Sequence, residues 1–202
     1  MKLTALKCAD KTWAGAGFNM NDRIVSLTDV DIIFDQGSGG LVAWGWQGLP
    51  EAVTSICGIP AFEYNKKGEP VKHPNGCISV DHVVLHSNDA EFVKAEFAKL
   101  QLHPRAVRDD IYPGLTQIFY RPGQGTVIEV VVNKDFPKAF LWGATVVVTD
   151  IDVAKNLLKE NASEPKKAVQ PGRKIMTVRH RNLHMETNMA MMTPHAKKQA
   201  KI

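Results

Sequence analysis

The sequence lacks an uninterrupted run of roughly 18 apolar residues, the length that a membrane-spanning helix needs. Its first segment, residues 1–20, has only scattered apolar residues and carries Asp10 among its lysines. It therefore lacks the pattern of a secretory signal and of a transit peptide. These absences predict a protein with no membrane partner.

The chain is also poor in cysteine. Cys8, Cys57 and Cys77 lie far apart, are odd in number and form no CxxC pair. We therefore expect neither a disulfide framework nor a zinc ribbon. The simplest compartment for such a chain is the reducing cytoplasm.

Basic residues show no interleaving with aromatic residues of the kind that a nucleic-acid surface has. The net charge of +4 is carried partly by lysines of the loop 66–72 and of the C-terminal segment 195–202. We interpret that segment as a solvated basic tail and expect no nucleic-acid partner. The composition, 44% hydrophobic and 23% charged, is ordinary for a globular protein.

Residues 1–76 are expected to form an N-terminal β-hairpin region and a linker that pack on the core. Two strand-like runs, 24–34 and 40–47, flank the glycine-rich stretch 37–40 and predict a β-hairpin. That stretch lacks the lysine and the following helix of a phosphate-binding loop, so it indicates a turn. Residues 63–76 are polar and end in the turn-like His73-Pro74-Asn75-Gly76.

Residues 77–135 carry the order strand, helix, strand, strand, strand. A strand is predicted over 78–86 and a helix after the capping residues Asn88 and Asp89. Three short strands are then predicted near 106–107, 116–120 and 126–132. Proline-glycine turns separate them.

A similar order returns in residues 136–194. Strands are predicted over 141–148, 174–179 and 184–192, with a helix that starts at Asp150, while one strand of this second set is not visible. Asp89 and Asp150 are 61 residues apart, and the same spacing aligns residues 79–85 with 140–146. Two similar modules indicate a duplicated fold.

Two polar residues interrupt apolar strand faces. His82 lies between Val80 and Val84 on its face, and Glu129 lies between two valines on its own. An unpaired buried carboxylate is costly, so Glu129 must be protonated, paired, exposed or metal-bound. If both strands line one cavity, the pair suits Zn²⁺, Fe²⁺, Mn²⁺, Ni²⁺ or Co²⁺. The ordinary alternative is a hydrogen-bonded histidine and a solvent-facing glutamate.

Several motifs resemble the vicinal oxygen chelate superfamily, which includes glyoxalase-like proteins, bleomycin resistance proteins and extradiol dioxygenases. In the first module they lie at 80–85, 117–121 and 125–131, and in the second at 141–143, 170–173 and 177–179. The resemblance covers about residues 73–194 and is greatest to uncharacterised glyoxalase-like members. It implies an α+β fold of paired βαβββ modules that form a half-open mixed β-barrel.

The resemblance also implies a divalent metal ion at the cavity floor, with ligands from the first and last strands of each module. His82 and Glu129 occupy these positions in the first module, and Glu129 is also the candidate catalytic residue. The second module departs from the pattern, because Gly143 and Ala190 stand at the matching positions and have no ligating side chain. Other polar residues share the predicted strand parity of Ala190, although each shift by two residues moves a ligand by about 7 Å. These are His184, Glu186 and Asn188.

Four further residues are candidates for substrate binding. Gln117 is a hydrogen-bonding candidate, and Arg121 could pair with Glu129 or with an anionic substrate. Trp142 could form a wall of the cavity, and Arg173 could lie at its mouth. The alternatives are an exposed Arg121, a Trp142 packed in the core and an Arg173 that begins a strand.

Two functions compete. The first is a divalent-metal-dependent lyase, isomerase or dioxygenase that acts on a small oxygenated substrate through Lewis-acid chemistry. The alternative is a metal-free protein of the same fold that binds or sequesters a small molecule. A structural or partner-binding module is a third interpretation. Because proteins of this superfamily often dimerise, a homodimer is also expected.

Overall fold

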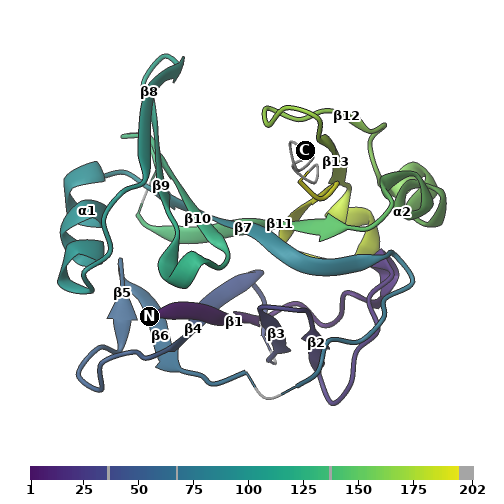
Figure 1. Ribbon diagram of the computed structural model, residues 1–202, viewed down its shortest axis with the longest axis horizontal. Coiled ribbons are helices and arrows are strands. Elements are labelled where there is room, and N and C mark those ends of the chain that lie inside the picture. Colours follow the sequence, from purple (N-terminus) through teal and green to yellow (C-terminus); the bar gives the residue numbers. More distant parts are fainter. Residues whose placement is uncertain (36, 67, 137, 196–202) are drawn as a thin grey trace, which may run out of the picture.

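Two β-sheets build the protein (Figure 1). The computed structural model describes residues 1–35, 37–66, 68–136 and 138–195, and the side chains of residues 110 and 111 are outside that description. The predicted basic tail lies outside the described residues from residue 196 onward. None of the helices in the described part of the chain is long and apolar enough to cross a membrane.

The N-terminal sheet has six strands in the order β2-β3-β1-β4-β6-β5. Its strands are β1 (Lys2–Cys8), β2 (Ile24–Ser26), β3 (Asp31–Phe34), β4 (Leu41–Gln47), β5 (Ser55–Ile56) and β6 (Ile59–Glu63). The predicted hairpin between 24–34 and 40–47 is wrong, because β1 lies between β3 and β4, parallel to the first and antiparallel to the second. The run 24–34 is itself split into β2 and β3, which pair with each other.

The second sheet has eight strands in the order β12-β13-β14-β11-β7-β10-β9-β8. Its first half contains β7 (Cys77–Ser87), α1 (Ala90–Lys99), β8 (Ala106–Tyr112), β9 (Leu115–Tyr120) and β10 (Val127–Val132). Its second half contains β11 (Phe140–Val148), α2 (Ile151–Leu158), β12 (Lys166–Lys167), β13 (Lys174–Val178) and β14 (Asn188–Met192). Short 3-10 helices are η1 (Ala14–Ala16), η2 (Pro122–Gln124), η3 (Lys159–Asn161) and η4 (His180–Leu183).

The two halves repeat one another in register. In the first, β7 pairs in parallel with β10 and places His82 opposite Val127. In the second, β11 pairs in parallel with β14 and places Gly143 opposite Asn188, with both residues 61 positions further along the chain. The two helices start alike, because the N-cap side chains of Asp89 and Asp150 both accept hydrogen bonds from backbone N–H groups of the first turn.

The predicted α+β fold of paired βαβββ modules is confirmed by this strand order. The sheet is mixed and open, since β12 and β8 are its two ends, and it curves so that one face is concave (Figure 1). The strand that the sequence did not reveal is β12, which has two residues only. The prediction for the last strand was too long, because β14 begins at Asn188, after η4.

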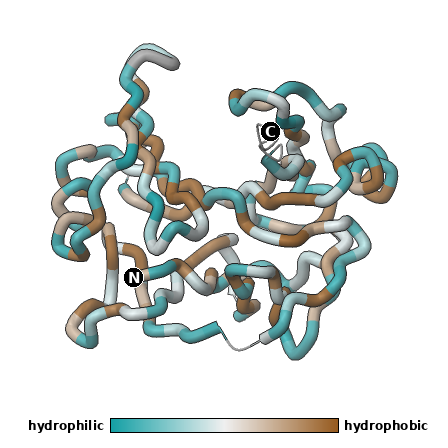
Figure 2. The backbone as a smooth tube through the Cα atoms, in the orientation of Figure 1, coloured by the Kyte–Doolittle hydropathy of each residue, from teal (hydrophilic) through white to brown (hydrophobic). Residues whose placement is uncertain are grey.

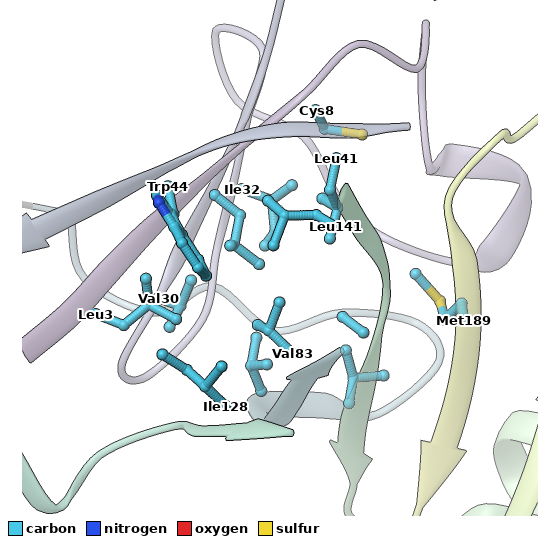
Figure 3. Packing of buried hydrophobic residues seen from close by; sticks show 14 of the residues in the cluster. Leu3, Cys8, Val30, Ile32, Leu41, Trp44, Val83, Ile128, Leu141 and Met189 are labelled. Carbon is cyan, nitrogen blue, oxygen red and sulfur yellow. The ribbon is translucent and has the colours of Figure 1, made fainter. Parts of the chain in front are cut away.

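The N-terminal sheet packs on the convex outer face of the eight-stranded sheet, not on its concave face. Buried side chains such as Leu3 and Trp44 meet Val83, Ile128 and others between the sheets (Figure 3). Hydrophobic residues are concentrated along the strands (Figure 2). Burying one such aliphatic side chain contributes about 1.5–3 kcal/mol. Because alternate residues of a strand face opposite sides, His82 and Glu129 lie on the concave face.

A buried carboxylate joins the two sheets. Asp10 is 3% exposed and accepts hydrogen bonds from the backbone N–H groups of Glu186 (2.8 Å) and Thr187 (3.2 Å) and from the indole N–H of Trp13 (2.8 Å). Because these N–H groups bond to Asp10, residues 186–187 belong to an anchored loop before β14.

Candidate functional site

A bulge in β7 brings two neighbouring residues to the same region of the concave face. In the β7–β11 pairing, His82 is opposite Thr145 but Val80 is opposite Val146, so Asp81 is an extra residue. The Nδ1–H of His82 donates a hydrogen bond to Asp81 Oδ2 (2.8 Å). Sequence reasoning missed Asp81, because regular alternation would place it on the face opposite to His82.

Arg173 holds the other side of this carboxylate. Its guanidinium is buried and forms an ion pair with Asp81, with 2.6 Å between Nη2 and Oδ1. Its Nε–H donates to the Thr193 carbonyl (2.7 Å), and Nη1 lies 3.2 Å from His195 Nε2. Arg173 was expected near the cavity mouth as a substrate-binding residue, whereas the structure places its charge against Asp81.

Burial raises the pKa of Asp81, but the hydrogen bonds and charges of His82 and Arg173 outweigh that effect and lower this pKa to about 2. Asp81 is therefore a carboxylate that can only accept hydrogen bonds. It follows that His82 Nδ1 carries a proton and that Nε2 is the atom directed to other partners.

His82 and Glu129 meet on the concave face. His82 Nε2 lies 3.5 Å from Glu129 Oε2, and the two side chains are 14% and 17% exposed. The second oxygen of Glu129, Oε1, accepts a hydrogen bond from the side-chain amide of Gln117 (2.6 Å). The structure therefore brings together three of the residues singled out from the sequence.

The two facing atoms form an electrostatically incomplete pair. With Nδ1 protonated, a neutral imidazole of His82 presents a lone pair at Nε2, and an ionised Glu129 presents another at Oε2. Two acceptors at this distance repel each other. A positive charge between them, either a proton or a metal cation, converts the repulsion into attraction.

In the second module, residues 138–194 as the structure describes them offer no counterpart to this pair. A Cβ atom added at Gly143 would lie 2.2 Å from the carbonyl oxygen of Asn188, so the backbone of β14 occupies the space of a side chain. Ala190, the counterpart of Glu129, ends in a methyl group. The backbone of β14 therefore excludes a side chain at position 143.

The other polar residues considered for the second module do not replace the missing ligands. His184 has a left-handed backbone (φ 56°) at the end of η4, and Glu186 lies in the loop held by Asp10. Neither belongs to β14, so neither shares the strand parity that was predicted for it. Asn188 does belong to β14, and its amide donates to the Trp142 carbonyl (3.0 Å).

The residues present could supply two ligands to a metal ion. Adjacent ligands of a tetrahedral ion, each about 2.1 Å from it, lie about 3.4 Å apart, which is close to the separation of Nε2 and Oε2. Asp81 fixes the tautomer that leaves Nε2 free, as carboxylates often do beside metal-bound histidines. In the described part of the chain, however, no group of three or more His, Cys, Asp or Glu residues could hold a metal ion. Water or substrate oxygens would have to fill the other positions.

Aromatic side chains cover another part of the same face. His86 is stacked between Phe136 (4.4 Å between ring centroids) and Trp142 (5.4 Å). Burial lowers the pKa of His86, which favours its neutral form. Trp142 remains 41% exposed, so the structure places it at the surface instead of in the core. Its indole is available to a ligand.

Arg121 directly follows β9 and precedes η2. It is exposed, and its Nε–H donates to the Gly125 carbonyl (3.3 Å), whereas Glu129 is paired with His82 and Gln117. Arg121 helps to line a pocket of about 240 Å³ together with Arg105, which the sequence analysis did not single out. Nothing in the local pattern marks Arg105, because only the fold brings it beside Arg121.

No family model matches the chain, and no curated protein matches it. Among solved structures, methylmalonyl-CoA epimerase from Mycobacterium tuberculosis is 12% identical, with a TM-score of 0.49 over 60% of this chain and 91% of that one. A hypothetical protein, BH1468 from Bacillus halodurans C-125, is 17% identical, with a TM-score of 0.47 over 61% and 98%. The epimerase of Streptomyces coelicolor in complex with 2-nitronate-propionyl-CoA is 9% identical, with a TM-score of 0.47 over 59% and 99%. Similarity at this level assigns no activity to the chain.

Proposed function

We propose that the protein is an enzyme that acts on a small oxygenated molecule at the concave face, with His82 and Glu129 sharing a divalent cation. The observation that carries this proposal is the 3.5 Å approach of His82 Nε2 to Glu129 Oε2, each with its other polar atom already bonded. These two atoms face each other, so one positive partner between them, a metal cation or a proton, would serve both. Candidate ions are Zn²⁺, Fe²⁺, Mn²⁺, Ni²⁺ and Co²⁺.

The vacancies in the second module define how a substrate would bind. Since Gly143 and Ala190 add no ligand, most of the coordination positions stay open to oxygens of a substrate or of water. A cation bound there would supply Lewis-acid polarisation of those oxygens, which suits isomerase, lyase and dioxygenase chemistry alike. Glu129 is the catalytic candidate, because its Oε2 faces His82 Nε2 while its Oε1 is held by Gln117.

Two other features support a small-molecule site. Trp142 exposes its ring on the same face and can stack on a planar group. Gln117, by its hydrogen bond to Oε1, holds the carboxylate of Glu129 in one orientation. The modules at 77–135 and 136–194 would then form the site, with residues 1–76 as their support.

A second function, metal-free binding of a small molecule, is favoured by one specific observation. The carbonyl oxygen of Asn188 blocks the position of a third ligand at Gly143, and stable metal sites usually have three or more protein ligands. In that case a proton on His82 would neutralise the pair, and the concave face would hold a ligand without reaction.

Metal analysis separates the two functions. Wild-type protein and the variants His82→Ala and Glu129→Ala would be purified without a nickel column. Each protein would be loaded with each candidate ion and dialysed, and its bound metal would then be measured. The matched controls are His103→Ala and Glu160→Ala, which change exposed residues of the same types. Stoichiometric metal that is lost in both site variants and kept in both controls supports the enzyme. Wild-type protein that retains none of the ions overturns it and leaves the binding protein.

A further inference from the structure

We propose that the substrate carries an anionic head group, a carboxylate or a phosphate, which binds between Arg105 and Arg121. This inference names the substrate class and rests on the proposed function for the reaction itself. Its physical basis is a pocket beside the His82–Glu129 pair that contains two arginines and no acidic side chain.

The pocket is formed where three strands of the first module begin or end. Its lining consists of Arg105, Phe119, Tyr120, Arg121, Gln124 and Val127. Arg105 directly precedes β8 and is tied to β9 by its backbone N–H, which donates to the Phe119 carbonyl (2.7 Å). The fold therefore fixes the backbone of both arginines near each other.

The charges of these arginines are not neutralised by the protein. Neither Arg105 nor Arg121 forms an ion pair with any acidic side chain that the structure describes. Among the described residues, Arg121 bonds only through its Nε–H, which donates to the Gly125 carbonyl, so none of these residues takes up its terminal nitrogens. Two more cations lie close: Arg108 sits over the Phe119 ring (5.2 Å to its centroid), and Lys2 runs alongside the turn at Gly123. This concentration of positive charge attracts an anion.

The size of the pocket indicates what part of a ligand it takes. Its volume of about 240 Å³ is below the range of about 300–1,000 Å³ that is usual for whole drug-sized ligands. The pocket therefore fits a head group with a few attached atoms. The planar fork of an arginine matches the oxygens of carboxylates and phosphates, which makes these the expected groups.

The register of the sheet connects this pocket to the candidate active site. Val127 is the residue opposite His82 in the β10–β7 pairing, and Phe119 is opposite Glu129 in the β10–β9 pairing. Neighbouring strands are about 4.8 Å apart, so a small molecule held by the arginines reaches the His82–Glu129 pair with its next few atoms. The arginines position the substrate, and the pair acts on it.

Anion titrations test this inference without knowledge of the substrate. Inorganic phosphate and benzoate would be titrated separately into the wild type, Arg105→Gln, Arg121→Gln and the double variant, and followed by NMR of the arginine Nε–H resonances and by calorimetry. Lys134→Gln is the control, because it removes an exposed cation that does not line this pocket. We expect one site in the wild type, about tenfold weaker binding or more in the double variant, and no change in the control. The anion that binds more tightly identifies the head group.

Several results would overturn the inference: no saturable binding of either anion to the wild type, or equal affinity in the wild type and the double variant. The same titrations with His82→Ala separate this inference from the proposed function. Neither arginine is bonded to His82 in the described structure, so anion binding should persist in that variant even where metal binding is lost. Thermal unfolding of each variant checks that these exposed substitutions leave the fold intact.

Discussion

The side chains of His82 and Glu129 meet diagonally across two parallel strands. Val127 is the residue opposite His82, and Val84 is opposite Glu129, yet Nε2 and Oε2 are 3.5 Å apart. The short distance between these atoms depends on the register of β7 and β10 and on the bulge in β7. The bulge places Asp81 where its carboxylate accepts a hydrogen bond from His82 Nδ1 and so fixes the orientation of the imidazole.

Removal of Asp81 should allow the imidazole proton of His82 to move from Nδ1 to Nε2. In Asp81→Ala the hydrogen bond to Nδ1 is lost, so the imidazole proton is no longer held on that nitrogen. We expect the ¹⁵N shifts of the His82 ring to move toward the Nε2–H tautomer and metal affinity to fall about 10–100-fold. His103→Ala, which changes a distant exposed histidine, is the control for metal affinity. Unchanged ring shifts and unchanged metal affinity would contradict the positioning role of Asp81.

Asp81 and Arg173 should show strong thermodynamic coupling. The Arg173 side chain is 1% exposed and that of Asp81 is 11% exposed, and each neutralises the other, so Asp81→Leu or Arg173→Met alone leaves a largely uncompensated charge. We expect each single variant to lower the free energy of unfolding by about 3–5 kcal/mol, and the double variant to lose much less than the sum. Urea unfolding of the four proteins measures the coupling. Additive losses would show that the two side chains stabilise the fold independently.

The two vacancies of the second module should respond differently to substitution. Gly143→Ala adds a Cβ against the Asn188 carbonyl oxygen, so β14 must shift, and we expect the variant to lose at least about 1–3 kcal/mol of stability. Ala190→Glu adds a carboxylate to a partly exposed residue that already has a Cβ atom. We expect Ala190→Glu to tighten metal binding, because it supplies a third ligand.

Thermal unfolding and metal titration, applied to both variants, check these expectations. A Gly143→Ala protein as stable as the wild type would contradict the steric closure. For Ala190→Glu, metal affinity equal to that of the wild type would show that position 190 does not face the pair. Ala190→Gln is the matched control, since it adds a similar volume without a charge.

His73 should make stability decrease in mild acid. It is 3% exposed, its Nδ1 accepts the backbone N–H of Asn19 (3.1 Å), and its Nε2 lies 3.3 Å from the Ser26 carbonyl. Burial lowers the pKa of His73 below the ordinary value for a histidine, although the hydrogen bond with the Ser26 carbonyl acts in the opposite direction. The native state therefore keeps His73 neutral at a pH where the unfolded chain binds the proton.

The consequence is that the free energy of unfolding falls as the pH drops below about 6.5, and keeps falling until the native His73 is also protonated. Urea unfolding between pH 7.5 and 5.5 should show a shallower decline in His73→Gln than in the wild type. His103→Gln, at an exposed site, should follow the wild-type curve. If the free energy of unfolding declined equally with pH in His73→Gln and in the wild type, His73 would not be the cause of the decline.

Much of the eight-stranded sheet could be predicted from local patterns. The apolar runs of β7, β10 and β11, the capping residues Asp89 and Asp150 and the 61-residue spacing all follow from residues that are close in sequence. The strand face of His82 and Glu129 also follows from alternation. The lack of ligating side chains at positions 143 and 190 follows from the 61-residue spacing, applied to the ligand positions that the family resemblance implies. Short-range geometry carries this information, because side-chain direction repeats along a strand.

The N-terminal sheet could not be predicted in the same way. The apolar runs 24–34 and 40–47 suggested a hairpin, since both are rich in strand-forming residues and a glycine cluster separates them. Their real partner is β1, which comes earlier in the chain and lies between them. Pairing of this kind depends on how much apolar surface the three strands bury together. A local sequence pattern does not contain this information.

The sequence by itself determined the two βαβββ modules, the helix starts and the strand faces, because these depend on periodicity and capping within a few residues. Only the tertiary structure decided that Asp81 sits in a bulge beside His82, that Arg173 neutralises it, and that Arg105 adjoins Arg121. The reason is physical: bulges, register and contacts between distant strands are set by the competition among all strands for partners and for burial. The candidate site combines residues of separate strands and loops, so its geometry is defined only once all strands have found their partners.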